Sequence, residues 1–276
     1  MPAAAGERGV RTSVAAGGNI DPMHQFTVEP IVGLHAGGYD ISFTNSALWM
    51  AIALLCFWGF MIGGMKRELV PGRWQMMVEG LTGFVTNMMR TNIGPEGRKF
   101  TPYVFSLFTF ILICNFLGLF PIGIIRPLGV NAHSFAATSH FSITGVLAIL
   151  SFSIVLIVGF GRHGFHFFSL FVPHGTPWYI ALLVAPIEFV SFFVRPFSLG
   201  LRLFVAMTAG HILLDVFGSF IVTGLNAGPG YGLLVSLPSF LLIIGISALE
   251  ILVAAIQAYV FALLTSLYLN DAINLH

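Results

Sequence analysis

Arg202 is the residue whose chemistry is hardest to reconcile with its surroundings in this sequence. It lies in the run 198–204 (Ser-Leu-Gly-Leu-Arg-Leu-Phe), inside a long apolar segment. A guanidinium stays protonated at any pH that a protein meets. Placing one at the centre of a bilayer costs from about 3 to above 10 kcal/mol. A cost of this size predicts that Arg202 meets a negative charge, a water-filled cavity, or both.

Other polar side chains in the same segment follow the helical repeat. Glu188, Arg195 and Arg202 are seven residues apart, so two helical turns return each to nearly the same face. Ser191 and Ser198 fall on that face as well. The pattern predicts a polar route that leads from the inner side of a membrane to Arg202. The alternative is a structural ion pair between Glu188 and Arg195, which leaves the second arginine unexplained.

A second polar group lies beyond Arg202. His211 and Asp215 are one turn apart, and the last apolar segment carries Glu250 and Gln257 seven residues apart. If the last two segments form an antiparallel hairpin, His211 comes within a turn of Glu250. The same hairpin places Arg202 within a turn of Gln257.

Two earlier segments also carry polar residues near the same outer side, Asn115 and His140. Each could join the outer group, and each could equally be a satisfied buried polar residue. A different group, His163, His166 and His174, belongs to an inner loop. Because cysteine and carboxylate partners are missing there, we expect solvated histidines, no metal site and no cofactor.

Titratable groups on both sides of a permanent cation suit the movement of protons. His211 exchanges protons near neutral pH, and Glu250 and Glu188 do so if burial favours their neutral form. Arg202 cannot relay a proton, and its charge repels one that attempts direct passage. No acid of this chain lies opposite Arg202 on the hairpin, so we expect the missing carboxylate on another subunit.

The composition is that of an integral membrane protein. The chain has 276 residues, of which 57% are hydrophobic and 8% charged, and its mean hydropathy is +0.91. A soluble domain carries about 25% charged residues. Cys56 and Cys114 both lie in apolar segments, which excludes a disulfide framework. We expect a flexible tail over 1–25 without a secretory signal peptide, and a single membrane domain over 26–276.

The predicted fold is all-α, with about five membrane-embedded helices and one amphipathic surface helix. The expected crossings are 45–64, 102–125, 136–160, 177–225 and 231–270. The last two exceed the ~20 residues that a bilayer requires, so we expect them to be steeply tilted, with possible kinks at Pro186 and Pro196.

The amphipathic helix is expected over 74–90, lying on the inner membrane surface or against a partner. Its predicted apolar side consists of Trp74, Met77, Val78, Leu81, Val85 and Met88. Its predicted polar side consists of Gln75, Glu79, Thr82, Thr86 and Arg90.

Basic residues predict the orientation of the chain. The interval 66–99 holds six of the 12 lysines and arginines. By the positive-inside rule this interval is cytoplasmic, which puts the N-terminus outside and the C-terminus inside. The weak targeting signal favours a bacterial inner membrane over a mitochondrial inner membrane.

Four motifs resemble subunit a of the F-type ATP synthase, in the branch of alphaproteobacteria and mitochondria. They are Val-Pro-Gly-Arg-Trp-Gln at 70–75, Asn-Phe-Leu-Gly-Leu-Phe-Pro at 115–121, the run 198–204 with Ala-Gly-His at 209–211, and 249–259. The resemblance covers about residues 22 to 272. One departure is Ala206, where the family usually has Asn, so the role of that Asn is not transferred.

The resemblance implies a proton-translocating stator subunit without an active site of its own. Arg202 would face the carboxylates of a rotating ring of c subunits and separate two offset half-channels. The outer half-channel would contain Asn115, His140, His211, Asp215 and Glu250. The inner one would contain Glu188, Ser191 and Arg195, with Gln257 and Ser198 near Arg202. The implied partners are the c-ring, b-type peripheral stalk subunits, the rest of the synthase and membrane lipids, with no nucleic acid.

Two other functions were weighed against this one. A proton-coupled secondary transporter usually shows internal repeats and broken helices at the midplane, and the sequence contains no repeat. A purely structural membrane subunit leaves Arg202 without a purpose.

Overall fold

The computed structural model describes most of the chain beyond residue 41. The described residues are 30–32, 35–36, 39–40, 42–65, 71–119, 137–164, 167, 178–226 and 228–274. The predicted tail over 1–25 lies outside them, so the division into tail and membrane domain stays a prediction.

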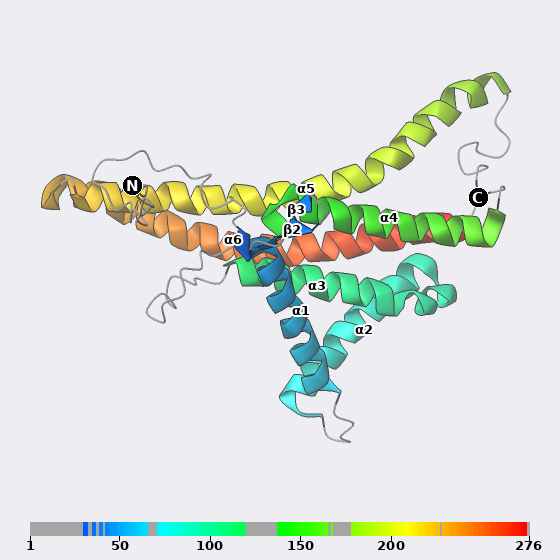
Figure 1. The fold of residues 1–276 in the computed structure, drawn as a ribbon, viewed down its shortest axis with the longest axis horizontal. Helices are drawn as coiled ribbons and strands as arrows, with labels where there is room; N and C mark the ends of the chain where they lie inside the picture. Colours follow the sequence, from blue (N-terminus) through cyan, green and yellow to red (C-terminus); the bar gives the residue numbers. More distant parts are fainter. Residues whose placement is uncertain are drawn as a thin grey trace, which may run out of the picture.

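Six α-helices make up nearly all of the described structure (Figure 1). They are α1 Asn45–Gly64, α2 Arg73–Ile93, α3 Thr101–Leu119, α4 Phe141–His163, α5 Trp178–Asn226 and α6 Pro229–Ile273. All but α2 are long and apolar enough to cross a membrane. The predicted fold class, with five membrane helices and one amphipathic helix, is therefore confirmed.

Short elements connect or precede the helices. The 3-10 helices η2 Pro95–Lys99 and η4 Ala137–Ser139 stand before α3 and α4. Before α1, β1 Pro30–Val32 pairs antiparallel with β4 Phe43–Thr44, and β2 His35–Ala36 pairs with β3 Tyr39–Asp40. The sequence analysis did not predict these two- and three-residue strands.

The helices α5 and α6 form the predicted antiparallel hairpin (Figure 1). With 49 and 45 residues, they are each about 70 Å long at 1.5 Å per residue. The turn depends on Gly228, whose φ of +102° is one that L side chains rarely adopt. Near the turn the two backbones touch, because a Cβ on Gly224 would lie 3.1 Å from the Gly232 carbonyl oxygen.

The first part of α5 bends away from α6 (Figure 1). Pro186 and Pro196 lie inside this helix. A proline removes a helical hydrogen bond and its ring clashes with the preceding turn, so it kinks the helix. The remainder of α5 lies along α6, which leaves the Arg195 region at the point where the two helices separate.

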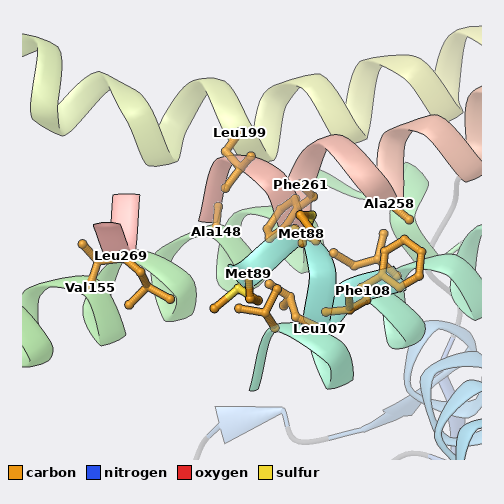
Figure 2. Close-up of a cluster of buried hydrophobic side chains, with 14 of the residues drawn as sticks. Met88, Met89, Leu107, Phe108, Ala148, Val155, Leu199, Ala258, Phe261 and Leu269 are labelled. Carbon is orange, nitrogen blue, oxygen red and sulfur yellow. The ribbon is translucent and has the colours of Figure 1, made fainter. Parts of the chain in front are cut away.

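One apolar core joins five of the helices. Figure 2 shows side chains of α2 to α6 meeting there, among them Met89, Phe108, Val155, Leu199 and Phe261. Close backbone approach contributes as well, because a Cβ on Gly200 of α5 would lie 3.1 Å from the Thr144 carbonyl oxygen of α4. The core fixes α5 and α6 against α3 and α4 at the level of Arg202.

The amphipathic helix α2 packs on α1, α3 and α6, and three residues near its start depart from the predicted sides. Gln75, expected on the polar side, is buried and donates from Nε2 to Glu79 Oε1 at 2.8 Å. Trp74 and Met77, expected on the apolar side, are half exposed. The reason is the crossing with α1, where Gly64 leaves room for Val78 and so rotates Gln75 inward.

A cavity of about 620 Å³ lies between α1, α2 and α3. Its lining is almost entirely apolar and includes Cys56, Phe60, Trp74, Met77 and Phe116. The indole of Trp74 donates from Nε1 to the Phe60 carbonyl oxygen at 3.1 Å, which fixes one wall of the cavity.

Candidate functional site

His211 of α5 and Glu250 of α6 lie side by side in the middle of the hairpin. His211 Nδ1 is 3.8 Å from Glu250 Oε1, and the carboxylate side chain is only 3% exposed. Neither oxygen of Glu250 accepts a hydrogen bond from the described residues. The hairpin predicted this proximity. The pair therefore forms a polar contact between a histidine and an acid at the α5–α6 interface.

Gly210 makes this proximity possible, and the sequence analysis did not single it out. A Cβ at this position would lie 2.5 Å from Glu250 Oε1. The carboxylate therefore occupies the space that any other residue would fill. The glycine next to His211 was the available signal in the sequence.

Asn115 and Gln257 approach the same stretch of α6. Asn115 of α3 is fully buried and donates from Nδ2 to the carbonyl oxygen of Ala254 at 3.0 Å, one turn after Glu250. Gln257 is 6% exposed, and its Nε2 has no hydrogen-bond partner among the described residues. Polar groups thus continue along α6 in the direction of Arg202.

The remaining two residues predicted for the outer group lie near α5. His140 directly precedes α4, at its N-cap position. The preceding Ser139 accepts a hydrogen bond through its carbonyl oxygen from Thr208 Oγ1 at 3.2 Å, which ties this segment to α5 close to His211. Asp215 is half-buried on α5, one turn beyond His211.

Arg195 is the centre of the predicted inner group. Its Nη1 donates to Asp271 Oδ2 at 2.9 Å and its Nη2 to Glu188 Oε1 at 3.4 Å. Its guanidinium also lies over the rings of Phe192 and Tyr268, 5.8 and 5.3 Å from their centroids. The sequence analysis missed Asp271, which lies one residue beyond the predicted end of the last helix.

The serines of the inner group are less involved. Ser198 donates from Oγ to the Arg195 carbonyl oxygen at 2.9 Å, within its own helix. Ser191 is exposed. The structure therefore joins Glu188, Arg195 and Asp271 by direct contacts and leaves Ser191 on the surface of α5.

Arg202 faces away from the rest of the chain. Its neighbours Leu199 and Leu203 are buried in the core, whereas Arg202 is exposed. It makes no hydrogen bond or ion pair with any part of the chain that the structure describes. Its proximity to Gln257 stays a prediction.

The described residues form no candidate metal site. No group of three or more His, Cys, Asp or Glu side chains in the described ranges could hold a metal ion. His163 lies with Nε2 3.1 Å from the Ile273 carbonyl oxygen. His166 and His174 lie outside the described residues.

Comparison with known proteins shows the family to which the chain belongs. The model of the family described as ATP synthase A chain matches residues 46–270. The chain belongs to this ATP synthase subunit a family. It is 65% identical to ATP synthase subunit a of Rhizorhabdus wittichii over 264 residues, covering 95% of this chain and 99% of the relative. It is 43% identical to that of Rhodospirillum rubrum over 259 residues, covering 92% and 99%.

The predicted resemblance to subunit a is therefore confirmed. These relatives are bacterial and carry the same subunit name, and five apolar helices suit a membrane location. This member of the ATP synthase subunit a family is a bacterial membrane protein. Membership favours a subunit of the synthase over the secondary transporter.

Proposed function

We propose that this chain carries protons across the membrane as the stator subunit of the rotary ATP synthase. The observation that carries the proposal is the placement of Arg202. A permanent cation stands exposed on α5 and has no anionic partner in the described part of the chain. A cation in such a place requires a carboxylate from another protein, and the c-ring carboxylates supply it.

The outer half-channel would consist of Asn115, His140, His211, Asp215 and Glu250. Protons enter from outside, and the buried His211–Glu250 pair delivers them toward a ring carboxylate. A histidine suits this step because it exchanges protons near neutral pH. Buried donors and acceptors left unpaired in the protein, such as Gln257 Nε2, are sites where water can bridge the route.

The inner half-channel would contain Glu188, Ser191 and Arg195. After nearly a full turn of the ring, each carboxylate returns to Arg202, whose charge favours loss of the proton. The proton then leaves inward past Glu188. Arg202 separates the two routes because it repels a proton and cannot relay one.

Partners and orientation follow from the same proposal. The chain contacts the c-ring through the face of Arg202 and joins b-type peripheral stalk subunits, the rest of the synthase and lipids. It has no active site of its own, and ATP is made on other subunits. We infer a multi-pass location in the bacterial inner membrane, with the N-terminus outside and the C-terminus in the cytoplasm.

The test is Arg202→Ala in inverted vesicles that contain the assembled complex. ATP-driven proton pumping, followed by quenching of a pH-sensitive dye, should be abolished while the complex still assembles. Arg90→Ala removes an exposed arginine on α2 and is the matched control, with pumping retained. Unchanged pumping by Arg202→Ala would contradict the proposal.

Two further variants test the outer half-channel. His211→Ala and Glu250→Ala should impair pumping less completely than Arg202→Ala, because each removes one proton carrier and water can substitute for part of its role. Full pumping in both would remove the His211–Glu250 pair from the route and leave the role of Arg202 intact.

A further inference from the structure

Three charged side chains meet where α5 and α6 separate. Arg195 of α5 contacts Glu188 one heptad earlier on the same helix and Asp271 near the end of α6. The Arg195 side chain is 25% exposed, and the side chains of Glu188 and Asp271 are 39% and 41% exposed. The described part of the chain therefore leaves the group partly uncovered, although it lies within the two long apolar helices.

The two carboxylates do not share Arg195 equally. The contact of Nη1 with Asp271 Oδ2 is 2.9 Å, the length of a good charge-assisted hydrogen bond. The contact of Nη2 with Glu188 Oε1 is 3.4 Å, beyond the usual range for N–H···O. Asp271 is therefore the main hydrogen-bond partner of the Arg195 guanidinium, and Glu188 binds it more weakly.

The surroundings keep Arg195 in this position. Its guanidinium lies between the rings of Phe192 and Tyr268. Pro196, one of the two prolines inside α5, follows directly. The pair of Arg195 and Asp271 thus joins the two helices where the backbone of α5 begins to leave.

We propose that Asp271 is a positioning residue of the inner half-channel, which holds Arg195 so that Glu188 stays free to bind and release protons. This inference rests on the proposed function. One guanidinium faces two carboxylates, so the ionised cluster has an excess negative charge. Because Asp271 binds the cation tightly, Glu188 carries that excess. A proton released by a ring carboxylate beside Arg202 binds a Glu188 carboxylate oxygen and then leaves to water as hydronium, which restores the carboxylate.

Removal of Asp271 changes the partner of the cation. Arg195 can then turn both of its terminal nitrogens to Glu188 and form the bidentate pair that guanidinium and carboxylate groups favour. Glu188 would be held as a fully paired carboxylate, and proton release would slow. Removal of Arg195 together with Asp271 frees Glu188 again.

The test is a double-mutant cycle measured as ATP-driven proton pumping in inverted vesicles with the whole complex. Asp271→Asn keeps the shape of the side chain and removes its charge, and should lower pumping about fivefold or more. Because Arg195 belongs to the proposed inner half-channel, Arg195→Gln should itself lower pumping. The double variant Arg195→Gln/Asp271→Asn should pump about as well as Arg195→Gln and at least about twofold better than Asp271→Asn. Recovery in the double variant is a result that a merely structural link between α5 and α6 would not give.

Two controls make the outcome decisive. Glu96→Gln is the matched loss of a carboxylate elsewhere, on η2, and should leave pumping unchanged. Arg202→Ala in the same vesicles tests the proposed function itself. If Arg202→Ala abolishes pumping and Asp271→Asn pumps normally, the role of Asp271 is wrong and the proposed function stands. If Arg202→Ala pumps normally, the proposed function is wrong.

The double variant also protects the test against a folding defect. If Asp271→Asn does not assemble, the proposal is tested by the double variant alone. Its pumping is then compared with the amount of assembled complex in the same vesicles. Retained pumping supports the role of Asp271. Pumping as low as in Asp271→Asn, or loss of pumping in an assembled double variant, overturns it.

Discussion

The carboxylate of Glu250 fills the space beside Gly210 between α5 and α6, where a larger residue would place its side chain. A Cβ at Gly210 would lie 2.5 Å from Glu250 Oε1, far inside van der Waals contact. The same carboxylate oxygen is 3.8 Å from Nδ1 of His211. The absence of one side chain therefore sets the position of the buried acid and its distance from the neighbouring histidine.

Gly210→Ala should disturb the His211–Glu250 pair and lower proton pumping. The added methyl group forces the carboxylate to move, at a cost of about 1–3 kcal/mol typical of overpacking. Gly218→Ala on the same helix is the matched control, because a Cβ there meets nothing within 4 Å. Pumping in vesicles and the thermal midpoint of the complex both measure the effect. Equal values for the two variants would contradict the packing argument.

The helices could be predicted because each is marked by composition and length. The hairpin was predicted from its two long apolar segments, and it brought His211 to Glu250 correctly. Both residues lie only moderately far from Gly228, so simple counting from the turn remains accurate there. The family of the chain was also recognisable from the residues around Arg202 and Glu250.

Counting from the turn fails at the other end of the hairpin. It places Arg202 level with Ala255 and therefore Arg195 level with Ala262, whereas Arg195 contacts Asp271, nine residues further along α6. Counting assumes two straight helices and short side chains. Instead α5 bends near Pro196, and arginine side chains extend along the helix. Asp271 could have been found by charge, because the last apolar segment has few acids and Arg195 needed a partner.

Cys56 should react with a membrane-permeant maleimide in the detergent-solubilised chain, and Cys114 should not. Cys56 is exposed and lines the apolar cavity between α1, α2 and α3, whereas Cys114 is 3% exposed within the core. Mass spectrometry should find one label per chain, lost in Cys56→Ser and kept in Cys114→Ser. Label on Cys114 in the folded chain would show that α3 packs differently.

Glu96 should make a small contribution to stability that depends on acid pH. Arg162 donates from Nη2 to Glu96 Oε1 at 3.0 Å and from Nη1 to Oε2. This hydrogen bond and the charge of Arg162 lower the pKa of Glu96 below its ordinary value of 4.5. The contribution is therefore present above pH 4.5 and is lost as the pH falls through the lowered pKa.

Thermal midpoints of the wild type and Glu96→Gln measure this contribution. The wild type should be slightly the more stable near neutral pH, since an exposed pair is worth little and is screened by salt. The difference should vanish in acid and shrink in high salt. A difference that grew as the pH fell would contradict the assignment.

The exposed face of α5 has a mechanical consequence. Around Arg202 it presents Val194, Val205 and Ala209, while Leu199 and its buried neighbours hold the helix from behind. Close to Arg202, such a face offers a passing surface few hydrogen bonds besides those of the guanidinium. Dispersion contacts between smooth apolar surfaces are easily exchanged for equivalent ones, so sliding would meet little friction. This side of α5 is therefore suited to a partner surface that slides past it, with Arg202 as the main electrostatic contact.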